Sequence, residues 1–207
     1  MKKVFGVGTN DVPYFTQKFE YSKVDGKRKN KLVWICPYYR KWKDMLKRCY
    51  YQTDFHTYKE CRVESSWLSL SCFTDWCKEQ ERVYGFSIKD MHLDKDILFI
   101  GNKVYCSEFC VFVDGKVNTF VLDSKAIRGD YKIGVSLNKT GKKYEAWCRH
   151  FSSRSQKYIG VFNTEDEAHE AWRKTKHKYA CELADSNLVV DDRVSDALRT
   201  RYLKDIM

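Results

Sequence analysis

The chain has 207 residues and carries 38 Lys and Arg against 28 Asp and Glu, a net charge of +10. No run of about 18 apolar residues occurs, which argues against a transmembrane helix, and the polar stretch after Met1 predicts no signal peptide. We therefore expect a cytosolic protein of one large or two small domains, whose basic balance favours nucleic acid over a membrane as its partner.

The nine cysteines form no CxxC pair. Their number is odd, and in a reducing compartment we expect most of them to be buried thiols. The spacings nearest to those of metal ligands are Cys72-x4-Cys77 and Cys106-x3-Cys110. Without a CxxC pair we expect no structural zinc.

Residues 1–31 predict a peripheral arm. Val4–Gly8 and Phe15–Val24 are strand-like, and Asp25-Gly26 is a turn. The segment Lys27-Arg28-Lys29-Asn30-Lys31 then carries four positive charges in five residues. Two interpretations stay open for it, a solvated turn or a segment that binds phosphate non-specifically.

Two helices with apolar stripes follow. Pro37 suits the first turn of the first helix. The stripe residues are Tyr38, Trp42, Met45, Leu46 and Cys49 in the first helix, and Trp67, Leu70, Phe73 and Trp76 in the second. Both stripes have helical spacing and predict core faces rather than ligand sites.

The stretch from Leu93 to Phe120 predicts a strand, a loop, a second strand and a short helix. Leu93–Ile100 and Cys110–Val113 are strand-like, and Asp114–Val117 leads into a helix that holds Asn118. This order, with Asp on the first strand and Asn in the helix, resembles the ββα-metal or HNH nuclease fold, in particular free-standing phage endonucleases of the homing type. The resemblance covers roughly residues 34–130, including the helical preamble and Gly101-Asn-Lys-Val-Tyr105.

The resemblance implies a catalytic site with one divalent metal ion, Mg2+ or Mn2+. In that family an Asp of the first strand and the helix Asn bind the metal, and a His after the Asp is the general base. Asp94 and Asn118 match the two ligand positions. Lys95 stands where the histidine is expected, followed by Asp96 as a further acidic candidate, and the nearest histidine is His92.

Lysine is a poor direct replacement for the histidine, because its unperturbed pKa of about 10.4 is too high for a base at neutral pH. Asp94 and Asp96 would hold it charged. Three interpretations stay open: a metal nuclease in which the metal alone activates water, a degenerate nuclease fold kept for DNA binding, and an exposed charged strand end without a role.

The stretch from Tyr131 to Trp172 predicts a three-stranded antiparallel sheet with one helix packed on it. Lys132–Asn138, Lys143–His150 and Gln156–Phe162 alternate in hydrophobicity and are separated by turn residues. Thr164–Glu167 is a capping box. The helix that it opens has one apolar face, formed by Ala168, Ala171, Trp172, Thr175, Tyr179 and Leu183.

The predicted sheet is strongly basic. Seven basic residues and one acid, Glu145, lie between Tyr131 and Gly160. If alternate residues face the helix, the other face carries Lys143, Glu145, Trp147 and Arg149. A twisted sheet of this width fits the DNA major groove; the alternative is a solvated sheet face.

This stretch resembles the AP2 DNA-binding domain. Gly134-Val135, Lys143–Ala146, Tyr158–Phe162 and Asn163–Ala168 follow that domain's pattern in order, over about fifty residues. The resemblance implies double-stranded DNA as the partner. The candidate contacts are Ser136, Asn138, Lys139, Lys143, Tyr144, Trp147, Arg149 and Lys157, with Lys27, Arg28 and Lys29 from the arm. Plant relatives usually carry arginine at the positions of Ser136 and Asn138, so the base preference stays open.

Together these patterns predict an α+β protein: a helical preamble and HNH-like ββα-metal unit, then an AP2-like sheet packed on a helix. The expected parts are an arm at 1–31, the HNH-like domain at 32–125, the AP2-like domain at 126–184 and a last helix in 185–207. The implied function is binding of double-stranded DNA with divalent-metal-dependent nicking, in the cytoplasm of an infected bacterial host. The alternative is a catalytically degenerate protein that only binds DNA or an acidic protein partner.

Overall fold

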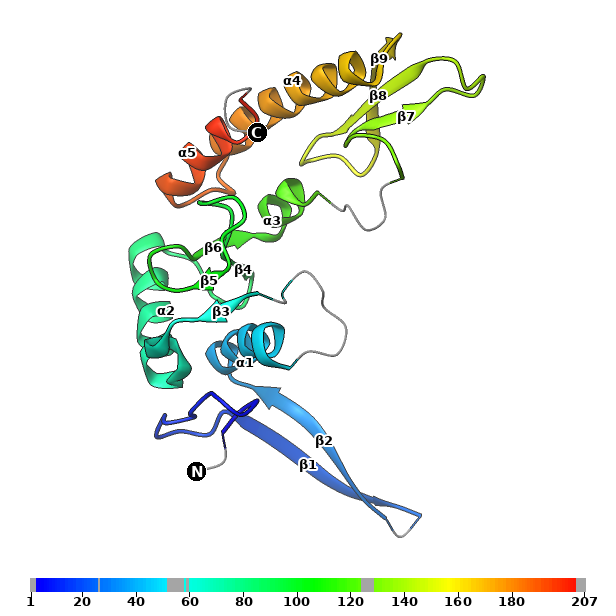
Figure 1. Ribbon diagram of the computed structural model, residues 1–207. Coiled ribbons are helices and arrows are strands. Elements are labelled where there is room, and N and C mark those ends of the chain that lie inside the picture. The colour runs from blue at the N-terminus through cyan, green and yellow to red at the C-terminus, as the bar shows by residue number, and fades with distance from the viewer. Residues whose placement is uncertain (1–2, 26, 52–57, 59, 124–128, 204–207) are drawn as a thin grey trace. The chain divides into compact units, whose positions relative to one another are not determined.

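The computed structural model describes residues 3–25, 27–51, 58, 60–123 and 129–203. Over these residues the chain is a mixed α+β protein with five α-helices and several small sheets (Figure 1), which confirms the predicted class. It divides into two compact units, Met1–Phe112 and Val113–Met207. The boundary expected between residues 125 and 126 lies outside the described residues.

The first unit begins with a hairpin. Strands β1 (Gln17–Val24) and β2 (Lys27–Ile35) pair antiparallel, and Asp25 at their turn has a positive φ of 51°. The basic segment 27–31 therefore lies in a strand, and its interpretation as a turn is wrong. The turn was expected at Asp25-Gly26, but Gly26 lies outside the described residues. The strand expected at Val4–Gly8 is reduced to one bridge between those two residues.

Two helices form the core of this unit. Helix α1 (Pro37–Tyr50) has proline in its first turn, and a 3-10 turn η2 (Ser65–Leu68) precedes α2 (Leu70–Tyr84). The indole of Trp42 is fully buried and donates a hydrogen bond to the carbonyl oxygen of Trp67 at 2.7 Å. The predicted stripes are confirmed as core, since most of their members are buried: Trp42, Met45, Leu46, Cys49, Trp67, Leu70 and Phe73.

Four short strands follow. Strand β3 (Arg62–Val63) pairs in parallel with β5 (Val104–Tyr105), and β4 (Met91–Asp94) pairs with β6 (Val111–Asp114). Strand β4 ends at Asp94 and does not continue to Ile100 as predicted. The cause is local, because the carboxylate of Asp94 accepts hydrogen bonds from backbone amides that follow it and turns the chain.

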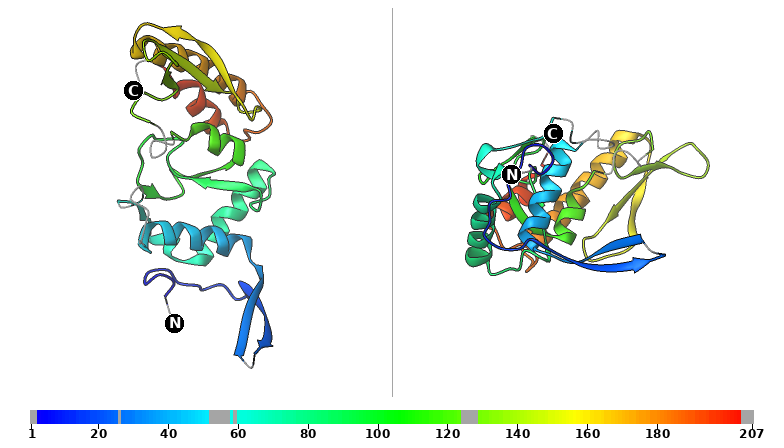
Figure 2. Two further views of the ribbon diagram at one scale, coloured as in Figure 1. Left: turned by 90° about the vertical axis from the view of Figure 1, so that its right-hand side faces the viewer. Right: turned by 90° about the horizontal axis from the view of Figure 1, so that it is seen from below.

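The second unit contains the predicted sheet and its helix. After α3 (Gly115–Val121), the strands β7 (Val135–Leu137), β8 (Tyr144–Arg149) and β9 (Gln156–Phe162) form an antiparallel sheet in that order. Helix α4 (Glu165–Ala184) lies along this sheet in both views of Figure 2. The capping box between Thr164 and Glu167 is confirmed, and α5 (Asp192–Thr200) packs on α4.

The sheet buries Ala146 and Cys148 against α4. Gly134 has a φ of +80°, and a Cβ at this position would lie 2.0 Å from Cδ1 of Trp172. Only glycine both adopts this backbone conformation easily and admits the indole so closely. The approach of Trp172 to β7 therefore fixes the sheet on the helix and leaves its opposite face uncovered by α4.

None of the helices in the described ranges has the length and apolar character needed to cross a membrane.

Candidate nucleic-acid interface and acidic loop

The sheet of the second unit has an outer face that points away from α4. Paired residues share a face, so the register groups Glu145 with Ser136 and Val161, Trp147 with Tyr158, and Arg149 with Gln156. We call these seven residues the outer face. The alternation predicted for Glu145, Trp147 and Arg149 is confirmed, because Ala146 and Cys148 between them are 0% and 1% exposed.

An aromatic pair occupies the middle of the outer face. The rings of Trp147 and Tyr158 meet edge to face with centroids 4.9 Å apart, and Tyr158 is 46% exposed. Trp147 is half-buried, so the exposed ring of Tyr158 offers most of the π surface that a ligand could reach. Tyr158 was not among the residues predicted from sequence. The signal that identifies it is the strand register, which a bulge between Ala146 and Trp147 shifts by one residue.

The positive charges lie at the two ends of this face. Lys139, Lys142 and Lys143 are exposed in the turn that enters β8, and Arg149 and Arg154 are exposed where β8 ends. A six-residue strand spans ~17 Å at 3.4 Å per residue, somewhat more than the ~12 Å width of the major groove. Cations with this separation match phosphates on both sides of a groove.

Asn138 organises the turn between β7 and β8. Its Oδ1 accepts hydrogen bonds from the backbone amides of Lys142 and Lys143 at 3.1 and 3.3 Å and from the Thr140 hydroxyl at 2.9 Å. Gly141 in the turn has a φ of +67°. The side-chain oxygen of Asn138 thus holds the lysine-bearing turn in place.

Three other basic or aromatic residues in or near the sheet do not join the outer face. Tyr144 belongs to the helix-facing set, half-buried with its ring edge-on to Tyr131. Lys157 is opposite Cys148, on the helix-facing side, and is exposed near the sheet's end. Lys132 forms an ion pair with Asp166 near the start of α4, so its charge is already compensated.

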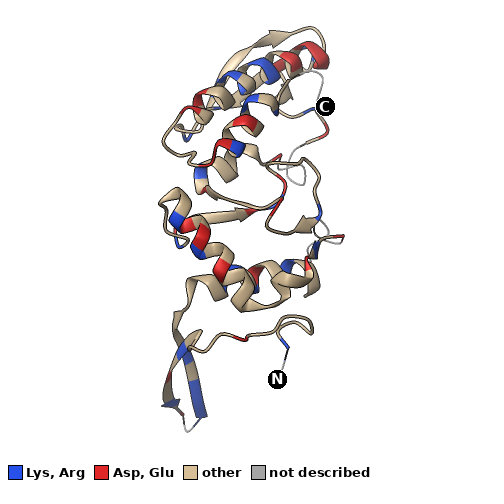
Figure 3. Ribbon diagram, turned by 90° about the vertical axis from the view of Figure 1, so that its left-hand side faces the viewer, with Lys and Arg blue, Asp and Glu red and all other residues tan. Residues whose placement is uncertain are grey.

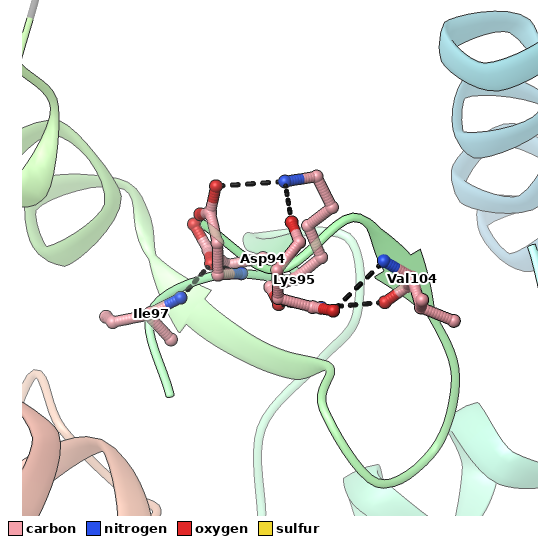
Figure 4. A network of polar contacts seen from close by, with 6 residues as sticks. Asp94, Lys95, Ile97 and Val104 are labelled. Carbon is pink, nitrogen blue, oxygen red and sulfur yellow. Dashed lines mark hydrogen bonds and ion pairs between the residues drawn. The ribbon is translucent and has the colours of Figure 1, made fainter. Parts of the chain in front are cut away.

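In the first unit, Asp94 closes an acidic loop after β4. It is 9% exposed, and its Oδ1 accepts hydrogen bonds from the backbone amides of Asp96 and Ile97 at 2.8 and 2.7 Å (Figure 4). Burial and the neighbouring charge of Asp96 raise the pKa of the Asp94 carboxyl, although the two backbone bonds oppose this shift. The interpretation of this segment as an exposed strand end is wrong for Asp94.

Lys95 is also buried, at 7% exposed. Its ammonium donates hydrogen bonds to the Asp96 carboxylate at 2.9 Å and to the carbonyl oxygen of Asn102 at 2.7 Å. Burial by itself lowers the pKa of Lys95, but the bond to Asp96 and nearby negative groups outweigh it, and the pKa is raised. Lys95 is therefore a fixed cation of the loop, and its raised pKa disfavours its acting as a base.

Asn102 holds the far end of the loop and was not among the predicted site residues. Its Nδ2 donates to the carbonyl oxygens of Lys95 and Val104 at 2.5 and 2.8 Å, and its Oδ1 accepts from the amide of Val104 at 3.0 Å. The Gly101-Asn102 dipeptide, which is typical of a turn, was the available sequence signal. Pattern alone did not reveal that its amide would span the loop.

The other predicted site residues lie elsewhere. His92 is exposed on β4 while Asp94 is buried, although both belong to the same short strand. Asn118 is half-buried in α3, and Lys27, Arg28 and Lys29 are exposed in β2. Within the described residues, no group of three or more His, Cys, Asp or Glu side chains is arranged to hold a metal ion.

Comparison of the chain with protein-family models, with curated proteins and with solved structures found no match.

Proposed function

We propose that the chain binds double-stranded DNA through the outer face of the β7–β8–β9 sheet. The observation that carries this proposal is the pair of exposed Tyr158 and half-buried Trp147 lying between two groups of exposed cations. A sheet can enter the major groove, where arginine reaches guanine edges and lysine reaches phosphates. The resemblance to the AP2 domain, which binds DNA through such a sheet, supports the same conclusion.

The arrangement assigns different tasks to the two ends of the face. The turn lysines Lys139, Lys142 and Lys143 have long, exposed side chains suited to phosphate contacts, which position a protein but carry no sequence information. Arg149 stands on the face itself, next to Trp147 and opposite Gln156, where its planar guanidinium suits two parallel hydrogen bonds to one base. Glu145 is the one acid of the face and opposes binding to phosphate.

Substitutions on the full chain test the proposal. Arg149→Ala should weaken binding to a preferred duplex by about 1–3 kcal/mol if it reads a base, and Lys143→Ala should weaken binding to all duplexes alike. Lys132→Ala is the matched control, because this lysine is paired with Asp166 and should have little effect. Fluorescence anisotropy with labelled duplexes measures all three, and unchanged affinity for both Arg149→Ala and Lys143→Ala contradicts the placement.

A second candidate function is metal-dependent nicking of DNA, in line with the resemblance to phage HNH nucleases that carry an AP2 domain. The observation that favours it is the neighbouring pair of carboxyl groups of Asp94 and Asp96, whose repulsion helps to raise the pKa of Asp94. Carboxylate oxygens are the ligands that Mg2+ and Mn2+ prefer. A divalent cation would offset this repulsion and would compete with Lys95, which already donates to the Asp96 carboxylate.

The residues that would hold the ion are Asp94 and Asp96 of the first unit; the third ligand that the resemblance implies, Asn118, belongs to the second unit. Oδ1 of Asp94 accepts the two backbone hydrogen bonds, and a carboxylate offers further lone pairs on its second oxygen. When bound, the metal would supply charge stabilisation at the phosphate and activation of water. The chain itself contributes the fixed cation Lys95 next to these carboxylates and a loop closed by Asn102.

A further inference from the structure

The β1–β2 hairpin is a two-stranded ribbon without a core of its own. Every described side chain from Lys18 through Trp34 is exposed. In Figure 1 the ribbon extends away from α1 as an arm. A two-stranded ribbon buries little and is marginally stable in water, so both of its faces are available to a partner.

The register separates these faces by chemistry. Residues directly opposite each other share a face, which places Lys18 opposite Trp34, Glu20 opposite Lys31, Ser22 opposite Lys29 and Val24 opposite Lys27. One face therefore carries the four lysines Lys18, Lys27, Lys29 and Lys31 against the single acid Glu20. We call it the lysine face. Figure 3 shows Lys and Arg on both strands of the arm.

The other face, which we call the aromatic face, differs in composition. It is formed by Phe19, Tyr21, Lys23, Arg28, Asn30 and Leu32. The guanidinium of Arg28 lies over the Tyr21 ring, 4.6 Å from its centroid. This face has two basic residues, one of them already engaged with a ring.

We propose that the lysine face binds the phosphate backbone of nucleic acid. The inference rests on the proposed DNA-binding function and adds a second binding surface to it. Lys27, Lys29 and Lys31 recur at every second position, about 7 Å apart at 3.4 Å per residue, along a polyanion with one charge per ~3.4 Å of each strand. A β-ribbon is also narrow enough to follow a groove.

The charge decides between nucleic acid and a protein as the occupant. A protein partner would seat on exposed apolar side chains, and on the aromatic face these are Phe19, Tyr21 and Leu32, between 42% and 59% exposed. Phe19 lies opposite Leu32 with Tyr21 beside them, a small cluster bordered by Lys23, Arg28 and Asn30. The lysine face carries Lys27, Lys29 and Lys31 in succession on one strand, with Glu20 as its one acid and Trp34 under Lys18, and this excess of cations favours phosphate.

The test compares two double variants of the full chain that remove the same charge from different faces. Lys29→Gln with Lys31→Gln removes two lysines of the lysine face, and Lys23→Gln with Arg28→Gln removes two cations of the aromatic face. Affinity for a short duplex of arbitrary sequence is measured by fluorescence anisotropy over a series of KCl concentrations. If both lysines contact phosphate, the slope of log K against log salt should fall by about 1.8 in the first variant, and by less than half as much in the second.

Equal losses in the two variants, or no loss in the first, overturn the inference. A loss only in the second variant also overturns it and indicates the aromatic face instead. Lys143→Ala in the same assay separates this inference from the proposed function, because this lysine is expected to contact phosphate whatever the sequence. A lysine-face loss without a Lys143 loss supports the hairpin and contradicts the sheet, and the reverse result contradicts the hairpin alone. Thermal unfolding should be unchanged in both variants, since no core residue is altered.

Discussion

Lys95 and Asn102 hold each other in a reciprocal pair of hydrogen bonds. The ammonium of Lys95 donates to the carbonyl oxygen of Asn102 at 2.7 Å, and the side-chain amide of Asn102 donates to the carbonyl oxygen of Lys95 at 2.5 Å. The pair closes the loop that follows β4. It explains why a lysine is tolerated at 7% exposure, because its charge and its hydrogen bonds are satisfied within the loop.

Asn102→Ala should destabilise the first unit. The substitution removes three hydrogen bonds of the side chain, to Lys95 and Val104, and leaves half-buried backbone groups without their partner. We expect a loss of about 1–3 kcal/mol in the free energy of unfolding, measured by urea denaturation. Asn30→Ala, on the exposed hairpin, is the control and should change it by less than about 0.5 kcal/mol. Equal effects of the two substitutions contradict the role of Asn102.

The stability of the second unit should depend on pH through Lys176. Its ammonium is buried, donates to the carbonyl oxygen of Phe120 at 2.8 Å and lies over the Phe120 ring. Burial lowers the pKa of Lys176 to about 8, whereas the unfolded value is about 10.4. Between these values the unfolded chain holds a proton that the folded chain lacks, so stability rises with pH in this window.

Lys176→Met removes this titration. The stability of the variant relative to wild type should be highest below about pH 8 and fall as the pH approaches about 10, by about 3 kcal/mol at most. Urea unfolding across this range measures the difference, and the comparison cancels the tyrosines and cysteines that titrate in both proteins. A difference that stays constant with pH would falsify the assignment of a lowered pKa to Lys176.

The sequence predicted the second unit better than the first because its signals are local. The alternation of β8 and the capping box at Thr164 and Glu167 each depend on neighbouring residues, and the structure contains both. Lys176 was missed because a lysine on a helix normally predicts an exposed position. Its burial depends on Phe120 and Tyr202, which only tertiary packing brings to it.

The candidate sites also depend on tertiary contacts that the sequence pattern does not contain. Side-chain hydrogen bonds end β4 at Asp94 and join Lys95 to Asn102. Hydrophobic periodicity contains no information on such side-chain bonds. The composition of the basic segment at Lys27 left a solvated turn and a phosphate-binding segment as open interpretations. Its register in β2, which separates the two faces of the hairpin, depends on pairing with β1.

Glu145→Gln should strengthen DNA binding. Glu145 is the acid of the outer face, and its removal takes away repulsion of phosphate worth about 1 kcal/mol at close range, roughly fivefold in affinity. Glu167→Gln is the matched control, since glutamine preserves the capping box and the same charge is removed from the start of α4. Anisotropy titrations in which both variants gain equally would show a general effect of net charge and not a contact at the outer face.

Asp94→Asn tests the nicking function without disturbing the loop. Asparagine keeps an oxygen that accepts from the amides of Asp96 and Ile97 but loses the charge that a metal ion requires. We expect plasmid nicking in the presence of Mg2+ or Mn2+ to be abolished and duplex affinity to stay within about twofold, because most cations lie elsewhere. Undiminished nicking by Asp94→Asn contradicts this site, and absence of nicking by wild type with DNA binding intact leaves the binding function alone.

The outer face as the DNA-binding surface is tested most directly by mapping the bound duplex on the labelled full chain by NMR. Titration with duplex DNA should shift the backbone amide signals of Lys143, Trp147, Arg149 and Tyr158 most strongly and in a saturable way, while those of α4 residues that face away from the sheet, such as Lys174 and Lys178, change little. Saturable shifts confined to α4, or no shifts on β8 and β9 at saturating DNA, would contradict the account.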